Sequence, residues 1–513
     1  MRKVSRITRI SLMIALFFTL DKGLGIIRQL IIGRQFGLSK ELDVFNAANN
    51  LPDMLFALIS GGALAIAFIP VLSEVLTKDG KSQSWRLFSS IANLAFIVTF
   101  SFSIVMALLA GPLVRSQLGI APGFTAAQQS LAVDLMRLNL ISTLIFSISG
   151  LVMAGLQANQ HFLFPALAPL LYDIGQIFGA VILAPEKGLN IGGLTLPAFG
   201  LGVNGLVYGV ILGALLHLII QIPGLIKYHF KWSIQINIKD INVIKVLKLM
   251  GPRLVSMVFI QLIFLVQDNL ASRLAVGAVS ALTYGWLIMQ VPETLIGTAI
   301  ATALLPTLSE MAVREEVAEL REKIVRTIKV MIALAIPISA ILAAGLLPLI
   351  QLAFGFSTAD AQIVMRTTQA FLIGVAGHSL VELAVRAFYA KQNAKVPMIA
   401  AASTFVVFLP LAIGLMLILG APGIAMANSI VFSLQAIVLI ILLGRSLQGK
   451  LSPGCTIINS LISGFVGALI VWLSLHTIQI DLPDWMVATM GMMVATVMAA
   501  IPIRRELRQL LKL

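Results

Sequence analysis

Apolar stretches of 18 or more residues follow one another along almost the whole chain. A stretch of this length is long enough to cross the hydrocarbon core of a bilayer as a helix. The chain has 513 residues, of which 59% are hydrophobic and 11% are charged, and its mean hydropathy is +0.99. Soluble domains carry about 25% charged residues, so this chain cannot hide its apolar surface in one water-soluble core. The sequence predicts an all-α polytopic membrane protein.

Hydropathy predicts about fourteen transmembrane helices. Several of the predicted spans exceed 25 residues, so we expect tilt, kinks or extensions beyond the bilayer. The first span begins with basic residues and an apolar run, as a signal peptide does, but no small-residue cleavage site follows, and we interpret it as an uncleaved helix. The predicted spans are 7–36, 43–75, 86–111, 126–156, 162–184, 199–224, 243–271, 277–309, 324–351, 361–389, 396–419, 422–444, 456–477 and 484–503.

Basic residues crowd alternate loops. The rich segments are the two termini and the loops 74–88, 225–248, 309–329, 386–395 and 445–450. The intervening loops carry only Lys40, Arg115, Lys187 and Arg273. The positive-inside rule then places both termini in the cytoplasm, which requires an even number of spans. The net charge of +14 is interpreted as topological, with contact to anionic lipids, rather than as a nucleic-acid surface. We expect a multi-pass protein of the bacterial cytoplasmic (inner) membrane.

Three short motifs occur twice, in the same order. They are [IL]-P-x-L-S-E at 69–74 and 305–310, A-x-Q-x4-P at 158–165 and 390–397, and a glycine-rich helix start at 202–206 and 420–424. Their offsets are 236, 232 and 218 positions, and six predicted helices separate each pair. The chain is therefore predicted to contain two parallel six-helix lobes, at 1–228 and 229–448, with residues 449–513 outside the repeat. Transporters with parallel repeats carry their substrate between the halves, whereas duplication without transport is the alternative.

Two motifs typical of nucleotide-binding enzymes occur in the sequence without the neighbouring residues that such sites require. Residues 200–205 fit GxGxxG but lack the preceding strand and the acidic residue of a dinucleotide site, and their four-residue glycine spacing continues to Gly213. This spacing favours close helix packing. Residues 444–450 fit G-x4-G-K, but Leu451 replaces the hydroxyl that binds magnesium. The single Cys455 and five scattered histidines exclude a disulfide framework and offer no metal-binding motif. We predict no enzyme, no cofactor and no metal.

Charges inside predicted spans are the candidate functional residues, because an ionisable group at mid-bilayer usually faces a cavity or a partner. Helix one holds the densest set, namely Asp21, Lys22, Arg28 and Arg34. Gly23 and Gly25 are expected to break the helix between these charges, and a broken helix with cations suits an anionic substrate. The alternative is that Asp21 pairs with a cation and Arg34 reaches an interface.

Further charges lie in later spans. Asp43 is predicted either to cap the second helix or to contact a cation of helix one. His378, Glu382 and Arg386 make one polar stripe, in which Glu382 and Arg386 form an ion pair or serve proton or ion coupling. Asp134 and Arg137 are expected to pair likewise. Asp173 and Asp268 are interpreted as lone acids, of which Asp268 joins the candidates for coupling.

The first two predicted helices contain five distinctive segments, which are GLGIIR at 23–28, RQFG at 34–37, DVFNA at 43–47, LPD at 51–53 and AFIPVLSE at 67–74. These segments give the sequence a resemblance to the MurJ/MviN family of lipid II flippases. It implies the multidrug/oligosaccharidyl-lipid/polysaccharide transporter fold, with two lobes around a cationic cavity and the last two helices forming a groove for a lipid tail. It also implies that undecaprenyl-diphosphate-linked disaccharide-pentapeptide moves from the cytoplasmic to the periplasmic leaflet by alternating access.

The sequence departs from the family pattern at three cationic positions. Lys22 stands where the family has arginine, and lysine keeps the charge but loses bidentate geometry. The arginines of helices two and eight would fall near Phe56 and Leu287, where both charges are absent. Either the cavity is less cationic than in the family, or another arginine compensates. The candidates for compensation are Arg253, which we also place among the substrate-binding residues, Arg137 and Arg386.

Other functions remain compatible with the sequence. They are a flippase for another polyprenyl-diphosphate-linked glycan, a drug or cation antiporter of the same superfamily that uses Glu382 or Asp268, and a non-transporting scaffold of wall synthesis. Membrane potential, protons and sodium are all open as driving forces. Membrane lipids and cell-wall synthesis proteins are the further partners we expect, and we expect the protein to act as a monomer.

Overall fold

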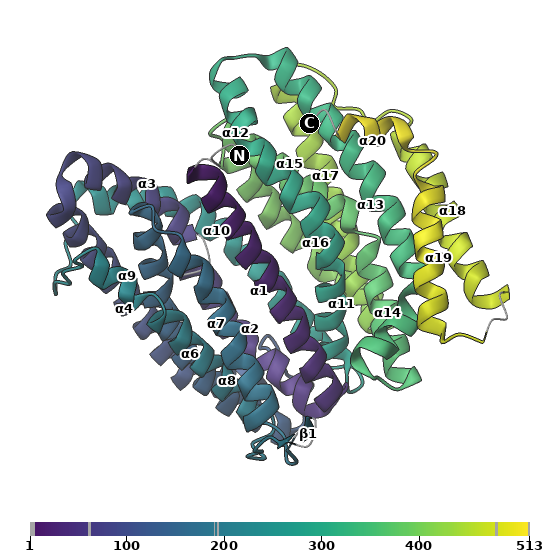
Figure 1. Ribbon diagram of the computed structural model, residues 1–513, viewed down its shortest axis with the longest axis horizontal. Coiled ribbons are helices and arrows are strands. Elements are labelled where there is room, and N and C mark those ends of the chain that lie inside the picture. The colour runs from purple at the N-terminus through teal and green to yellow at the C-terminus, as the bar shows by residue number, and fades with distance from the viewer. Residues whose placement is uncertain (1–5, 60–62, 189, 192–193, 478–480, 511–513) are drawn as a thin grey trace. The chain divides into compact units, whose positions relative to one another are not determined.

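The computed structural model describes residues 6–59, 63–188, 190–191, 194–477 and 481–510, and these are overwhelmingly helical. The chain forms two compact units, Met1–Leu265 and Val266–Leu513. The elements that begin in the first unit (Figure 1) are α1 (Arg6–Phe36), α2 (Lys40–Ile59), α3 (Ala63–Lys78), α4 (Gly80–Leu108), α5 (Ala110–Arg115), α6 (Ala126–Ala158), α7 (Leu163–Phe178), the π-helix η1 (Gly179–Leu183), β1 (Asn190–Ile191), β2 (Leu194–Thr195), α8 (Val203–Ile219), α9 (Ile222–Lys227) and α10 (Ile241–Ala271).

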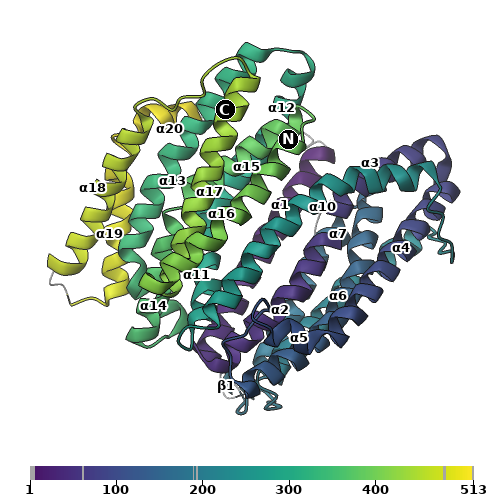
Figure 2. The same cartoon turned by 180° about the vertical axis from the view of Figure 1, so that it is seen from behind.

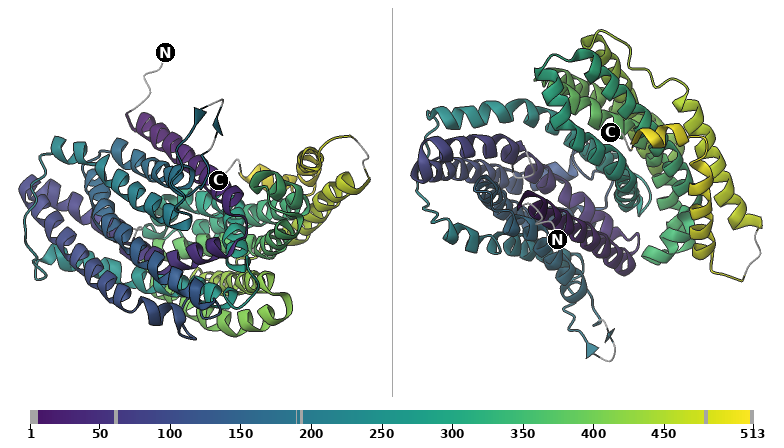
Figure 3. Two further views of the ribbon diagram at one scale, coloured as in Figure 1. Left: turned by 90° about the horizontal axis from the view of Figure 1, so that it is seen from below. Right: turned by 45° about the horizontal axis from the view of Figure 1, so that its top comes forward.

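The second unit contains the end of α10 and all later elements. These are α11 (Ala278–Glu293), the π-helix η2 (Thr294–Thr298), α12 (Ala299–Val313), α13 (Val317–Phe354), α14 (Thr358–Leu372), α15 (Val375–Ala390), α16 (Lys395–Leu419), α17 (Ala421–Ser446), α18 (Thr456–Thr477), α19 (Asp484–Ala499) and α20 (Arg504–Leu510). Strands β1 and β2 pair antiparallel in a small hairpin that protrudes beyond the helix ends (Figure 3).

The multi-pass helical prediction is confirmed. Within the described residues, ten helices are long and apolar enough to cross a membrane, and the pair α14–α15, bent by 43°, would make an eleventh span. The other predicted spans coincide with α1, with α2 and α3, and with α19. Charged residues interrupt α1, whereas α3 and α19 have 16 residues each. The number fourteen stays a prediction.

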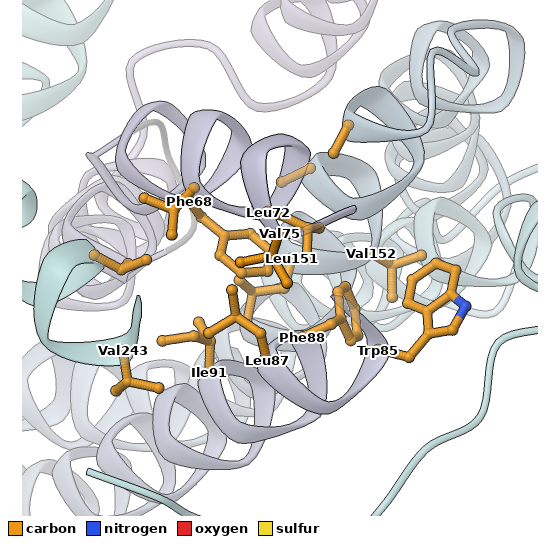
Figure 4. Close-up of a cluster of buried hydrophobic side chains, with 14 of the residues drawn as sticks. Phe68, Leu72, Val75, Trp85, Leu87, Phe88, Ile91, Leu151, Val152 and Val243 are labelled. Atoms are coloured by element: carbon orange, nitrogen blue, oxygen red, sulfur yellow. The ribbon is translucent and has the colours of Figure 1, made fainter. Parts of the chain in front are cut away.

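An aromatic and aliphatic cluster holds one end of the first unit together. Its buried side chains come from α3, α4, α6 and the first turns of α10 (Figure 4). Phe88 lies 5.8 Å from Trp85 and 5.9 Å from Phe68 between ring centroids, in tilted or edge-on contacts. Val243 and Val246 complete the cluster from α10. The start of α10 is therefore part of the hydrophobic core of the first unit.

Glycines bring α8 into backbone contact with α7 and with η1 and Ala184, which follow it, as their spacing predicts. A Cβ atom added to Gly209 would lie 2.7 Å from the Cα atom of Gly179, and one added to Gly205 would lie 2.7 Å from the Cα atom of Ala184. Only a residue without a side chain fits such contacts. Interfaces of this kind depend on van der Waals packing, because lipid is as apolar as a leucine side chain.

The sequence repeat is matched by a repeat in backbone geometry. Gln160 and Gln392, from the two copies of A-x-Q-x4-P, both have a φ of 57°, a left-handed conformation that is uncommon outside glycine. In both turns the next amide donates a 2.9 Å bond to a carbonyl five residues back. Gly202 and Gly420, before α8 and α17, also share their conformation, with φ of 55° and 65° and ψ near −138°.

Several helices of the second unit pack side by side. Helices α16 and α17 lie side by side (Figure 2), and α18 and α19 pack against α13. Ile341 of α13, Val471 of α18 and Ala495 of α19 belong to one buried cluster. The two helices outside the repeat are thus anchored on α13 within their own unit.

Candidate functional site

A buried ion pair joins α1 to α7 in the first unit. Arg28 Nη1 donates to Asp173 Oδ1 at 2.6 Å, and the side chains keep 19% and 7% of their exposed area. Gly25, one turn before Arg28, faces Asp173, and a Cβ atom there would lie at an ordinary van der Waals distance of 3.6 Å from Asp173 Oδ2. Asp173 is therefore not the lone acid that its apolar surroundings in the sequence suggested. A pair across 145 positions becomes visible only when the two helices are packed together.

Asp21 and Lys22 extend this group along α1. Lys22 Nζ lies 3.5 Å from Asp21 Oδ2 and 5.2 Å from the centroid of the Phe18 ring. The Lys22 side chain is 60% exposed, whereas that of Asp21 is 18% exposed. The pairing of Asp21 with a cation, one of the two sequence-based alternatives, is confirmed. Lys22 is the cation of this pair that remains accessible to an approaching anion.

Asp53 of α2 and Tyr172 of α7 complete what we call the N-unit cluster, consisting of Asp21, Lys22, Arg28, Asp53, Tyr172 and Asp173. Arg28 acts electrostatically on both Asp53 and Tyr172. Asp53 is exposed, and the Tyr172 ring meets Phe146 edge-on at 4.9 Å. The cluster brings three carboxylates together with two cations. Arg28 is thus held in place by acids rather than standing alone.

The predicted break in helix one is wrong, because α1 runs unbroken from Arg6 to Phe36. Glycine keeps its amide, so Gly23 and Gly25 can continue the ladder of helical hydrogen bonds. In an apolar environment an unpaired backbone amide costs several kcal/mol, roughly, which favours the continuous helix. Gly23 and Gly25 therefore lie inside one continuous helix.

Asp43 and Arg34 lie close to one another in sequence but differ in their surroundings. Asp43 is buried in the first turn of α2, and the cap comes from Ser39, whose Oγ accepts the Leu42 amide at 3.2 Å. The capping role considered for Asp43 therefore belongs to Ser39. The Arg34 side chain is exposed near the end of α1. The side chain of Arg253 lies outside the described part of the chain.

The second unit has its own polar group inside apolar helices. Arg386 of α15 pairs with Glu382 one turn earlier, as predicted, and donates from Nη2 to Thr302 Oγ1 of α12 at 3.1 Å. Glu293 lies close enough to both charges to interact with them electrostatically. This C-unit cluster, Glu293, Thr298, Thr302, Ser379, Glu382 and Arg386, has two carboxylates and one guanidinium. It carries one more negative charge than positive when both acids are ionised.

Glu293 stands at the junction of α11 with the π-helix η2. Thr298 Oγ1 donates to Glu293 Oε1 at 3.3 Å. Between them, Gly297 faces Ser379, and a Cβ atom at Gly297 would lie 2.5 Å from Glu293 Oε1 and 3.0 Å from Ser379 Oγ. Ser379 is fully buried, and its Oγ has no partner. Single-turn π-helices recur at functional sites. The sequence analysis missed Glu293, although an acid inside a predicted span was a sufficient signal.

His378 and Asp268 differ in their surroundings. His378 Nε2 contacts Asn428 Oδ1 at 3.0 Å, and its ring stacks on Phe432 with centroids 4.1 Å apart. His378 is therefore tied to α17, although it shares a helix with Glu382. Asp268 is half-buried in the last turns of α10.

The arginines considered as replacements for the missing family cations have other contacts. Arg137 lies 3.9 Å from Asp134, so the predicted pair is confirmed, and Arg137 Nε donates to the Ala107 carbonyl at 3.0 Å. Arg386 is paired with Glu382. Each of these two arginines is thus already engaged by oxygen atoms of its own unit.

The comparison with known families decides the assignment. The family model described as "Lipid II flippase MurJ" matches residues 32–496. The chain belongs to the MurJ family. The "Lipid II flippase MurJ" of Burkholderia cenocepacia is 30% identical over 390 residues, which cover 74% of this chain and 73% of that protein. The "Probable lipid II flippase MurJ" of Treponema pallidum is 24% identical and covers 87% of this chain and 84% of its own length.

Solved structures agree on the fold of the MurJ family. A structure of "Lipid II flippase MurJ, inward closed conformation" has a TM-score of 0.78 at 21% identity and covers 96% of this chain and 99% of its own. An inward-facing multidrug resistance MATE family transporter of the MOP superfamily has a TM-score of 0.69 at 14% identity, with coverage of 85% and 98%. The sequence-based resemblance is confirmed, and the family is one of flippases rather than of enzymes.

Proposed function

We propose that this MurJ-family protein moves lipid II, an undecaprenyl-diphosphate-linked disaccharide-pentapeptide, from the cytoplasmic to the outer leaflet by alternating access. The observation that carries the proposal is the family match over residues 32–496. The N-unit cluster supports it, because a diphosphate needs fixed cations inside a membrane protein. Both termini are proposed to lie in the cytoplasm, with the protein in the bacterial cytoplasmic membrane.

Lys22 and Arg28 are proposed to bind the diphosphate in different ways. Lys22 is the exposed cation, and an ammonium group binds phosphate as a point charge. Arg28 Nε is buried without a partner, so the guanidinium has donor capacity left after its bond to Asp173. A phosphate that replaces Asp173 would receive a bidentate contact. In this scheme Asp173 holds Arg28 in position until the substrate arrives.

Asp21, Asp43, Arg34 and Arg253 are proposed as further residues that position the headgroup. The acids orient the cations or accept hydrogen bonds from the sugar and peptide hydroxyls and amides. Residues 449–513, which include α18 and α19, are proposed to receive the lipid tail, since a polyprenyl chain needs only apolar surface. This division leaves residues 1–228 and 229–448 as the two lobes that alternate.

Coupling to an ion is proposed for the C-unit cluster, with Glu382, Arg386 and His378 from α15 and Asp268 from α10. The structure adds Glu293, which stands beside the Glu382–Arg386 pair. The excess carboxylate of this cluster would be neutralised by a proton or another monovalent cation. Proton binding would be reported by Glu293→Gln, which mimics the protonated state and is expected to uncouple flipping from a pH gradient while flipping down a lipid gradient continues.

Leaflet-resolved labelling of lipid II tests the main proposal. Cells depleted of this protein are expected to accumulate lipid II in the cytoplasmic leaflet. Unchanged outward exposure, in a strain with no second flippase, would refute the assignment. If another polyprenyl-diphosphate glycan accumulates instead, the cargo proposal is wrong and the flippase mechanism stands. Export of a cationic drug without any lipid effect would favour the antiporter, for which the two carboxylates of the C-unit cluster are the supporting observation.

A matched pair of variants tests the residues. Arg28→Ala is expected to abolish rescue of the depleted strain at normal expression, because the diphosphate loses its bidentate partner. Arg314→Ala is the control, since Arg314 forms an exposed ion pair with Glu310 one turn earlier. Exposed pairs contribute about 0.2–1 kcal/mol, so this variant should rescue fully. Full rescue by Arg28→Ala would remove Arg28 from the mechanism.

A further inference from the structure

Residues 228–240, between α9 and α10, form a segment without helix or strand, with turns at 228–229 and 238–239, that lies along the first turns of α4. Asn93 of α4 donates from Nδ2 to the carbonyls of Ser233 and Gln235, at 2.9 Å each. The Ser233 amide donates to Ser89 Oγ at 3.2 Å. We call this segment the α4 strap. Side chains of α4 hold the backbone of the strap in place, so the strap is not an unattached loop.

Side chains of the strap add further contacts to α4. Trp232 Nε1 donates to Asn93 Oδ1 at 2.9 Å, and Gln235 Nε2 donates to the Arg86 carbonyl at 3.1 Å. The Phe230 ring lies 5.1 Å from both Trp85 and Phe88, edge-on to each. Asn93 therefore uses both amide hydrogens and its carbonyl oxygen on the strap. The aromatic cluster of the first unit holds the strap at its N-terminal end.

Apolar and polar residues alternate along the strap. The even positions Trp232, Ile234, Ile236 and Ile238 keep 57%, 86%, 44% and 59% of their surface exposed. The odd positions are polar, namely Lys231, Ser233, Gln235, Asn237 and Lys239. In the part of the chain that the structure describes, these four apolar side chains are exposed. We call them the apolar row of the strap.

The strap lies level with the beginning of the lipid-facing surface of α4. Exposed apolar side chains on α4 begin at Phe96 and continue to Leu108. Phe96 is three residues beyond Asn93, which is about 4.5 Å along the helix axis. The strap is thus placed where the hydrocarbon region gives way to the headgroups. Tryptophan is enriched at this level of membrane proteins because its ring is amphipathic.

Positive charge surrounds the apolar row. Residues 225–248 contain five lysines and a single acid, Asp240. Lys231 and Lys239 are exposed and lie at the two ends of the row. Apolar side chains flanked by lysines are the combination that binds surfaces of anionic lipid. The same composition is poorly suited to a protein partner, since cores of protein interfaces are depleted in lysine.

We propose that the α4 strap is an interfacial anchor that binds anionic phospholipid. Trp232, Ile234, Ile236 and Ile238 enter the boundary between headgroups and acyl chains, and Lys231 and Lys239 contact lipid phosphates. The anchor fixes the first unit at a defined depth in one leaflet. This binding is separate from the movement of substrate and does not depend on the proposed function.

Spin labelling of the full chain tests the anchor. Cys455 is the single cysteine, so Cys455→Ser gives a background for labels at Ile234→Cys and Ile236→Cys, with Asn237→Cys as the matched control. In vesicles of phosphatidylethanolamine and phosphatidylglycerol, labels at 234 and 236 should collide more with oxygen than with a water-soluble nickel complex. The label at 237 should show the opposite preference. Equal nickel access at all three positions would overturn the proposal.

Three further measurements separate lipid from other occupants. Lys231→Gln with Lys239→Gln should lower the oxygen preference at 236 in these vesicles, whereas Lys450→Gln should leave it unchanged. An effect of Lys450→Gln as large as that of the double variant would overturn the role of the strap lysines. Inorganic phosphate should not displace the strap, because a free anion cannot replace the apolar contacts. Spin–spin broadening in place of oxygen access would show a second copy of the chain on this face and would also overturn the proposal.

A fold control accompanies the labels. Asn93→Ala removes three hydrogen bonds to the strap, one of them from the Trp232 indole, and leaves the three isoleucines of the apolar row unchanged. The label at 236 should become more mobile and lose its oxygen preference, while the protein elutes as the parent does in size-exclusion chromatography. An unchanged label would refute the claim that α4 sets the depth of the strap. If labelled variants fail to fold, quenching of tryptophan fluorescence by brominated lipid, compared between the unlabelled chain and Trp232→Leu, gives the same decision.

Discussion

Removing Asp173 should damage the protein more than removing its partner Arg28. The pair is short and largely buried, with the guanidinium retaining slightly more exposure than the carboxylate. Loss of one partner of a buried pair costs about 3–5 kcal/mol, because the other charge is left uncompensated. A guanidinium cannot give up its proton, so Arg28 would stay charged in Asp173→Ala. We expect a loss near the lower limit, about 3 kcal/mol, since Arg28 keeps some contact with solvent.

Arg28→Ala leaves a different problem. A carboxyl group can bind a proton and become a neutral hydrogen-bonding group, so the remaining cost is that of an unsatisfied polar group, about 1–2 kcal/mol. The double variant removes both members of the pair and should lose about 2 kcal/mol, mainly from packing. The single losses then exceed the double loss by about 2–3 kcal/mol, which is the range found for residues in contact.

Denaturant titration in detergent micelles measures the unfolding free energies of the wild type, the two single variants and the double variant. These four values give the coupling free energy of the pair. The reasoning depends on the order of the single variants and on the size of the coupling. If Arg28→Ala proves the more damaging change, or if the two losses simply add, the pair is not the buried and isolated contact described above.

Two further predictions concern packing and pH. Gly209→Ala should lower the free energy of unfolding by about 1–3 kcal/mol, because its Cβ atom would lie 2.7 Å from the Cα atom of Gly179. Gly23→Ala has open space around it and should stabilise α1 slightly. Equal melting temperatures of the two variants would contradict this prediction. Hydrogen bonds from Lys245 and Lys78 lower the pKa of Glu74, at the polar end of α3, from 4.5 to about 2. Its stabilising effect should be complete above pH 4.5 and disappear as the pH falls toward 2, so wild type and Glu74→Gln should differ in melting temperature at neutral pH and converge in acid. A constant difference across that range would refute the role of Glu74.

Features set by local sequence could be predicted with little error. The spans follow from long apolar runs, and the glycine face of α8 follows from its four-residue spacing. The repeated turns at Gln160 and Gln392 follow from a motif in which a left-handed residue ends one helix before the next begins. Each of these depends on neighbours within about one or two turns of chain, which are the contacts that a single sequence reveals most clearly.

Features set by packing between helices were missed or misread. The partner of Arg28 lies 145 positions away, so no spacing rule connects the two residues. Glu293 is one acid in an apolar span of the sequence, and its contact with Thr298 across the π-helix and its nearness to Glu382 and Arg386 are seen only in the structure. Gly23 and Gly25 of α1 were predicted to break the helix, although their amides continue it. In each case the sequence showed the charged residue and its apolar surroundings, but not the residue on another helix that it contacts.

The core of the first unit has a consequence for biosynthesis. Trp85 and Phe88 are covered by Phe230 of the strap and share a cluster with Val243 and Val246 of α10. A nascent chain that has emerged only as far as α9 therefore still exposes these rings. The ribosome must deliver about another turn or two of α10 before the first unit can close. A chain that has emerged to a point before residue 243 would leave this half open to chaperones or proteases, whereas one that has emerged through residue 265 contains all of the first unit.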